Sequence, residues 1–166
     1  MPKIKLFSSK KIRLLLLALC LIWCGSIFYM SAEPADVSSA RSGGLTHDLL
    51  NQIIPDFETL GGARQTKIED VAEHLIRKTA HFLSYTALGI FTCLFSLSFL
   101  SKKRTHFLRS LALCVLYAAS DEWHQSFVPG RGPSVSDVLL DSTGAVCGIF
   151  FVLFAADFWL KRNKTR

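Results

Sequence analysis

The hydrophilic parts of this 166-residue sequence contain no cysteine. All five cysteines fall within strongly apolar stretches, where we expect buried free thiols and no disulfide bonds; they are Cys20, Cys24, Cys93, Cys114 and Cys147. The chain also lacks internal repeats, low-complexity tracts and motifs for binding nucleotides or nucleic acid. Outside the apolar stretches, no segment could form a separate soluble core. These absences indicate one domain without a nucleic-acid partner, and the sequence predicts no cofactor and no resident metal.

Apolar and charged residues are segregated along the chain. Half of the residues are hydrophobic, yet 19 are Lys or Arg and 13 are Asp or Glu. A helix that spans a membrane needs about 20 mostly apolar residues. Four stretches meet or approach that length, at 14–30, 80–100, 107–127 and 136–160. The sequence therefore predicts an all-α, polytopic membrane protein with about four transmembrane helices.

The first apolar stretch has two interpretations. Five basic residues precede it, as in a signal peptide. No small-x-small cleavage site follows, because Met30 occupies the third-last position before a cut after Ala32. We therefore favour a transmembrane helix that is retained.

Basic residues predict the orientation of the helices. Thirteen of the 19 lie in three clusters, before residue 14, at 102–109 and at 161–166. Because Lys and Arg favour the cytoplasmic side, both termini and the second connection are expected in the cytoplasm. The predicted parts are then 1–30, the cytoplasmic N-terminus and first transmembrane helix; 31–79, an extracytoplasmic connection with an amphipathic helix; and 80–166, a three-helix core.

The long connection is expected to begin as a loop that contains Gly43 and Gly44. Thr46 is placed to cap a short helix after this loop. Thr66 and Glu69 have the spacing of a capping box, and they predict the start of an amphipathic helix. This helix is expected to lie at the outer interface and to run into the second span.

Polar residues interrupt the apolar helices in three stripes, one near the start of the second span, one near the end of the third and one near the start of the fourth. An ionisable group inside a membrane costs about 2.5–3.5 kcal/mol, so we expect each of these groups to have a structural or functional role. With the predicted topology all three stripes lie near the extracytoplasmic side, and they form a shallow funnel. We expect catalytic roles for His81, Asp121, Glu122 and His124, and ligand-binding roles for Lys78, Tyr85, Gln125, Arg131, Asp137 and Asp141.

The connection 128–135, VPGRGPSV, is short and rich in Pro and Gly. It is expected to hold Arg131 over the funnel, next to a helix that Ser134 and Asp137 would cap. Arg131, Lys78 and the helix amides would form a cradle for a phosphate or a carboxylate. The carboxylates of the funnel would orient these cations, accept protons or hold a divalent ion.

Each stripe also has a purely structural interpretation. Arg131 would pair with Asp137 or Glu122 to close the loop, and Tyr85 would be an interfacial anchor. Gly144 and Gly148 have the spacing of small residues that let helices approach closely, and we assign them to packing. The two histidines His47 and His106 fall in predicted solvent-facing connections and are assigned no role.

Two sequence blocks resemble the signature of the VanZ-like membrane protein family. They are KTAHFLSYTALG at 78–89 and SDEWHQSFVPGRGPSVSDVLLDSTGAVCG at 120–148. The shared residues are Lys78, His81, Tyr85, Asp121, Glu122, Gln125, Phe127, Pro129, Arg131, Asp137, Gly144 and Gly148. One departure is Asp141, where the family usually has Asn, which adds a carboxylate. The resemblance implies a protein of the bacterial inner or plasma membrane, and the family is named for a protein associated with teicoplanin resistance.

Three functions remain open from the sequence. The first is binding or modification of an anionic envelope component at the outer leaflet, such as a lipid-linked phosphate or a cell-wall precursor; in the enzymatic version His81 or His124 would be the general base. The second is a non-catalytic membrane scaffold. The third is a small transporter subunit, which the lack of polar residues at depth disfavours. The lipid bilayer is the one partner expected in every case, and the sequence gives no oligomeric state.

Overall fold

The computed structural model describes residues 3–4, 6–7 and 9–164. Helices dominate the described chain, and the only strands within it are two-residue segments that pair antiparallel. In chain order the elements are β1 (Lys3–Ile4), α1 (Lys10–Ser31), α2 (Ala35–Ile53), the 3-10 helix η1 (Phe57–Thr59), α3 (Gly62–Ser96), β2 (Ser101–Lys102), α4 (Lys103–Gln125) and α5 (Val135–Lys164). The predicted all-α fold is confirmed.

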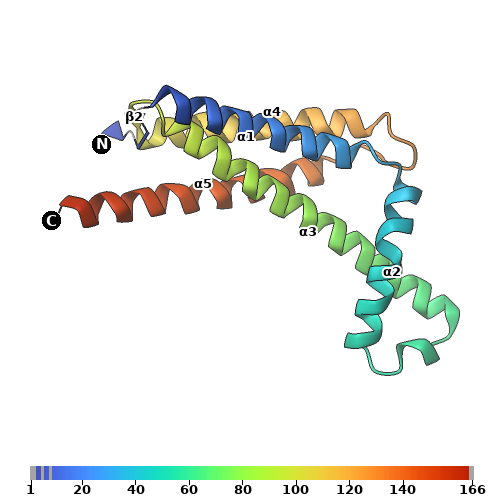
Figure 1. Cartoon of the computed structure of the whole chain (residues 1–166). Helices are drawn as coiled ribbons and strands as arrows, with labels where there is room; N and C mark the ends of the chain where they lie inside the picture. Colours follow the sequence, from blue (N-terminus) through green and yellow to red (C-terminus); the bar gives the residue numbers. More distant parts are fainter. Residues whose placement is uncertain (1–2, 5, 8, 165–166) are drawn as a thin grey trace.

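Four of the helices, α1, α3, α4 and α5, form an elongated bundle (Figure 1). Along the chain they alternate in direction, so α3 and α5 run parallel to each other, and both chain ends lie at the same end of the bundle. The most extensive packing is between α3 and α5, and both also contact α4. At the other end, the turn from α1 to α2 and the loop from α4 to α5 come together.

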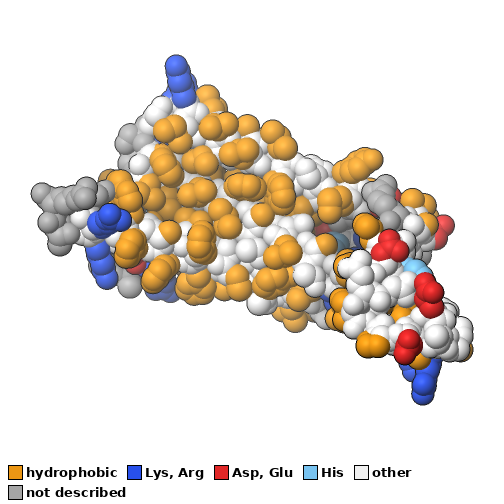
Figure 2. Space-filling model, turned by 60° about the horizontal axis from the view of Figure 1, so that its bottom comes forward, with side chains coloured by type: hydrophobic (Ala, Val, Ile, Leu, Met, Phe, Trp, Pro, Cys, Tyr) orange, Lys and Arg blue, Asp and Glu red, His pale blue; other side chains and the backbone are white. Residues whose placement is uncertain are grey.

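The bundle has the surface of a membrane-embedded protein. Three helices of the described chain, α1, α3 and α5, are long and apolar enough to cross a membrane. Their outward side chains are large hydrophobic groups, including Leu21, Ile22 and Phe154, which are 64–75% exposed. Figure 2 shows hydrophobic side chains spread over the face of the bundle that is turned to the viewer. In water this exposure would be unfavourable, whereas in a bilayer the apolar side chains would contact apolar lipid chains.

The fourth expected span, α4, has 23 residues and packs within the bundle, but it does not reach the same apolar composition. Several of its polar side chains are buried inside the bundle: Ser110, Asp121, Glu122 and Gln125. Composition alone therefore identifies three spans, and α4 is the fourth member of the bundle by packing.

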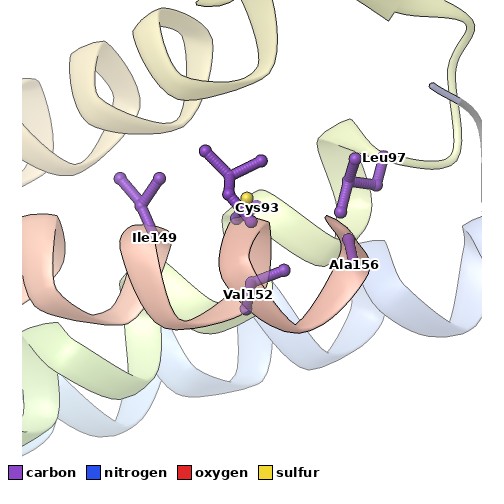
Figure 3. Packing of buried hydrophobic residues seen from close by; sticks show 6 residues of the cluster. Cys93, Leu97, Ile149, Val152 and Ala156 are labelled. Carbon is purple, nitrogen blue, oxygen red and sulfur yellow. The ribbon is translucent and has the colours of Figure 1, made fainter. Parts of the chain in front are cut away.

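A hydrophobic cluster joins α3 and α5 toward the end of the bundle that carries the termini. It contains Cys93, Leu97, Ile149, Leu153 and Ala156, together with Val152 (Figure 3). The five cysteines are free thiols, as expected. Cys147 is exposed on the outer face of α5, while Cys93 is completely buried in this cluster.

Close approach of α3 and α5 depends on glycine. A Cβ atom added to Gly144 would lie 2.4 Å from the carbonyl oxygen of Phe82, and one added to Gly148 would lie 2.1 Å from that of Thr86. On α3, a Cβ at Gly89 would lie 2.3 Å from the carbonyl oxygen of Ala145. The assignment of Gly144 and Gly148 to packing is thus supported, because a Cβ at either position would collide with the backbone of α3.

The expected loop after α1 is wrong: residues 35–53 form the helix α2. Gly43 and Gly44 lie inside this helix, and Thr46 is a buried residue in its middle and not its cap. The reason is tertiary, because α2 packs against α3 and this contact outweighs the low helix propensity of two glycines.

The amphipathic helix and the second span are one continuous helix, α3, as expected, but the predicted start is wrong. The helix begins at Gly62, and the Thr66 hydroxyl donates to the Gly62 carbonyl oxygen within it instead of capping it. At 1.5 Å per residue its 35 residues extend over about 52 Å, more than the roughly 30 Å of a hydrocarbon core. Its first turns project beyond the bundle beside α2 (Figure 1), continuing the line of the span instead of turning flat.

His106 is also placed differently from the expectation. It lies in α4 and is fully buried, and its Nδ1 is 2.9 Å from the Ser96 hydroxyl oxygen on α3. The histidine joins two helices at the end of the bundle that carries the termini. The sequence placed it in a connection because the apolar run begins only after it.

Candidate functional site

A polar pocket of about 160 Å³ lies at the end of the bundle opposite the termini, where α3, α4, α5 and the α4–α5 loop meet. Of the ten predicted site residues, six line this pocket: Lys78, His81, Glu122, Gln125, Arg131 and Asp137. The other lining residues are His74, Arg77, Gly130, Gly132 and Leu140. The three polar stripes of the sequence therefore meet at one level.

Two pairs of ionisable side chains connect α3 and α5 at this pocket. The Lys78 Nζ is 2.9 Å from Asp137 Oδ1, and the His81 Nδ1 is 3.6 Å from Asp141 Oδ2, which is an ion-pair distance but too long for a hydrogen bond. Because α3 and α5 are parallel, the steps of three and four residues along them bring the pairs one above the other. Asp141 is fully buried, whereas Lys78 and Asp137 remain about one-third exposed.

The α4–α5 loop is held by two contacts. The Ser134 backbone N–H donates to Glu122 Oε2 at 2.8 Å, and the Ala35 N–H at the start of α2 donates to the Pro129 carbonyl oxygen at 3.2 Å. Gly130 has φ +73°, a conformation that glycine adopts without a steric penalty. The predicted capping box of Ser134 and Asp137 is not formed, because Glu122 takes the Ser134 N–H and the Asp137 carboxylate pairs with Lys78.

Within the described part of the chain, Arg131 has no carboxylate partner. It makes no ion pair with Asp137 or Glu122, and its Nε is buried without a hydrogen bond. Burial, together with the nearby positive charge of Arg77, lowers the pKa of Arg131 from its ordinary value, although Asp121, Glu33 and Glu122 act in the opposite direction. The expectation that Arg131 closes the loop through an ion pair is therefore wrong.

Of the Lys and Arg side chains that line the pocket, Arg77 is the second for which the described residues supply no carboxylate partner. Its nearest hydrogen-bond acceptor is the Ser39 hydroxyl of α2, at 3.4 Å from Nη2. Sequence reasoning chose Lys78 and missed Arg77, which precedes it. The signal was available, since Arg77 is four residues before His81 and so shares its side of the helix.

A buried polar layer lies beneath the pocket. Asp121 is 2% exposed, and its Oδ2 accepts hydrogen bonds from the Ser31 hydroxyl at 2.9 Å and from the Gln125 side-chain amide at 3.2 Å. Tyr85 and Asp141 are completely buried, and the Tyr85 hydroxyl has no partner. Tyr85 is therefore no interfacial anchor. Ser31, the last residue of α1, was missed because a serine at the end of a span carries no sequence signal.

His124 lies outside the pocket. Its ring stacks on Phe28 of α1, with 4.1 Å between the ring centroids, and its Nδ1 is buried without a partner. The structure thus separates the two histidines that the sequence offered as general bases: His81 lines the pocket and His124 does not. Across the described ranges, no three or more His, Cys, Asp or Glu side chains are grouped so as to hold a metal ion.

Beyond the bundle, His47 of α2 contacts α3. Its Nδ1 is 2.8 Å from Glu69 Oε1, and this hydrogen bond raises the pKa of His47 above its ordinary value. The earlier assignment of no role overlooked this contact. Its ring also meets the buried Phe57 of η1, with 5.7 Å between the centroids.

The raised pKa of His47 predicts that the projecting α2–α3 hairpin is more stable in acid. A group whose folded pKa is raised contributes its stability below the unfolded pKa of about 6.5 and loses it as pH rises through the folded pKa. We expect resistance of this hairpin to limited proteolysis to be greater at about pH 5.5 than at about pH 8. Glu69→Gln should lower the NMR titration midpoint of His47 and abolish the difference; an unchanged midpoint would contradict the assignment.

The sequence matches a family model described as VanZ/LLP1 over residues 16–156. This match begins in α1 and so extends beyond the two blocks of the second half that carry the sequence resemblance. No curated protein and no solved structure matches the sequence.

Proposed function

Since the chain belongs to the VanZ/LLP1 family, we propose that it acts in a bacterial inner or plasma membrane by binding a phosphate-bearing envelope component in the polar pocket. The observation that carries this proposal is the pair of guanidinium groups of Arg77 and Arg131. Both line the pocket, and neither has a carboxylate partner among the described residues. A guanidinium presents several donors in one plane, which suits the oxygens of a phosphate.

The other charges of the pocket are already engaged. Lys78 is paired with Asp137, and Glu122 accepts the Ser134 N–H. Three cations of the lining, Arg77, Lys78 and Arg131, face two carboxylates, Glu122 and Asp137, which leaves an excess of one positive charge on the pocket wall. The first turn of α5 begins at Val135 next to the loop, and its N–H groups add a partial positive charge. An anionic ligand is the species that would balance this charge.

The distribution of basic residues supports an extracytoplasmic pocket. Basic side chains at the start of α1, at β2 and the start of α4, and near the end of α5 lie at the end of the bundle with the termini. By the positive-inside rule that end is cytoplasmic, and the polar pocket then opens toward the outer leaflet.

The scaffold and transporter alternatives predict different behaviour. In a scaffold the charges would hold helices together, yet Arg77 and Arg131 pair with no carboxylate on another helix in the part of the chain that the structure describes. A transporter needs polar groups across the membrane, whereas the buried layer with Asp121 and Asp141 lies next to the pocket at one end.

A catalytic version is favoured by one further observation, which is that His81 lies between the pocket and Asp141. Catalysis would require His81 to act as general base.

The direct test is titration of the purified protein with inorganic phosphate in micelles of a maltoside detergent, which carries no phosphate. We expect saturable binding that weakens with added salt, because the contacts are electrostatic. A matched titration with a neutral polyol should give none. Absence of saturable phosphate binding would overturn the proposal. If the pocket is also catalytic, His81→Ala should abolish turnover of a phosphate ester while phosphate binding survives.

The cellular part of the proposal is a link to glycopeptide response. Deletion of the gene is expected to change teicoplanin sensitivity and to alter the extracted envelope lipids, and the wild-type gene should restore both. If deletion leaves sensitivity and lipids unchanged, the link to the envelope would be withdrawn.

Two replacements of Glu122 give opposite predictions and so identify its role. Glutamine keeps a carbonyl oxygen for the Ser134 N–H and removes a negative charge, so Glu122→Gln should bind phosphate as tightly as wild type or more tightly. Glu122→Ala leaves the loop untied. Because a charge-assisted hydrogen bond contributes about 1.5–3 kcal/mol, this variant should bind phosphate about tenfold more weakly or worse. Calorimetric titration of both variants checks this, and tighter binding by Glu122→Ala would show that the loop contact is irrelevant.

A further inference from the structure

A second hollow, which we call the side groove, lies on the other side of Arg77, between α1, α2 and α3. It has a volume of about 290 Å³ and a mainly apolar surface. Met30, Leu45, Ile76 and Ala80 give it an apolar side, and Glu33, Ser38, Ser42 and Glu73 complete its lining with the residues that it shares with the polar pocket.

The side groove and the polar pocket share three residues: Arg77, His81 and Arg131 line both. The two unpaired guanidinium groups therefore stand between a polar space and a mainly apolar one. A small soluble anion would use the polar space alone. A ligand that uses both must have a charged group and an apolar part attached to it.

The position of the side groove indicates where the apolar part comes from. Met30 lies in the last turn of α1 and is 52% exposed, and the outward face of α1 is apolar, with Leu21 and Ile22 64% and 65% exposed. The groove is thus continuous with the surface that faces lipid chains. Ile76 is 42% exposed and Leu45 is 70% exposed, so neither is needed to fill a protein core.

We infer that the occupant of the joined spaces is a membrane lipid with a phosphate headgroup, whose phosphate lies at Arg77 and Arg131 and whose chain lies in the side groove. This rests on the proposed function and specifies its ligand. The lipid enters sideways from the outer leaflet between α1 and α3, and the headgroup reaches the polar pocket past Arg77. Glu33 and Glu73 line the groove but not the pocket, which favours a headgroup held on the pocket side of Arg77.

The test compares dodecyl phosphate with inorganic phosphate in micelles of a maltoside detergent, which carries no phosphate, and the quantity measured is the ratio of their dissociation constants. Ile76→Trp and Ala80→Trp fill the side groove at exposed positions. Leu75→Trp is the matched control, because Leu75 is the neighbouring residue, is 59% exposed and lines neither space. Dodecyl phosphate partitions equally into the micelles of all the variants, so differences between variants report the groove.

Wild type and Leu75→Trp should share one ratio. In Ile76→Trp and Ala80→Trp the advantage of the dodecyl chain should fall by about tenfold, which corresponds to losing contact with about two methylene groups. Inorganic phosphate should bind all four proteins equally. If both groove variants keep the wild-type ratio while phosphate still binds, the chain lies elsewhere and this inference is wrong. If wild type binds neither ligand, the proposed function fails with it.

Discussion

Replacement of both Arg77 and Arg131 by alanine is expected to weaken phosphate binding by about 100-fold or more. Each guanidinium would make charge-assisted hydrogen bonds worth about 1.5–3 kcal/mol, and 1.4 kcal/mol corresponds to about tenfold in affinity. The folded protein should not become less stable, because neither side chain has a carboxylate partner among the described residues. Loss of binding at unchanged stability is therefore the expected result.

The same pair of measurements separates a binding site from a scaffold. In a scaffold, removal of one charge leaves its buried partner unpaired and destabilises the fold. Phosphate titration and thermal unfolding of the double variant should accordingly be measured together. Arg64→Ala is the matched control, since Arg64 lies on the same helix outside both the polar pocket and the side groove. Unchanged phosphate affinity in the double variant would remove the basis of the proposal.

Much of the site was predictable because the spacing of residues along a helix determines which of them share a face. Lys78 and His81 are three residues apart, Asp137 and Asp141 are four apart, and each set lies on one side of its helix. With short connections the chain must reverse direction after α4, so the stripes had to meet at the same level. Spacing does not determine which cation pairs with which carboxylate. Four carboxylates and the cations near them allow many combinations, and only packing selects Lys78 with Asp137.

Part of the fold was not predictable from local patterns. Gly43 and Gly44 are poor helix formers, yet they lie within α2, which packs on α3. The contact between His47 and Glu69 joins residues of two helices, and no local sequence pattern predicts it. The apolar spans were visible because membrane helices must be apolar over about 20 residues. The more polar α4 belongs to the bundle through its packing and through the polar groups that it buries.

Gly148→Ala is expected to destabilise the bundle more than alanine at Gly89 or Gly144 would, because its added Cβ makes the shortest contact of the three. In an isolated helix this change would be favourable by about 0.8–1.0 kcal/mol. Here the new Cβ would lie 2.1 Å from the Thr86 carbonyl oxygen and 3.0 Å from the Ile90 nitrogen, both backbone atoms. Helices α3 and α5 would have to separate, at a cost of about 1–3 kcal/mol or more. The sign of the change is thus opposite to the helix propensity.

The matched control is Gly25→Ala on α1, where an added Cβ meets nothing within 4 Å. Its stability should stay equal or rise, whereas Gly148→Ala should show a lower midpoint in thermal or detergent-induced unfolding. Because the Lys78–Asp137 pair depends on the same approach of α3 and α5, Gly148→Ala should also weaken phosphate binding, and Gly25→Ala should not. Normal stability together with normal binding in Gly148→Ala would mean that the helices are not held at the spacing from which the polar pocket is built.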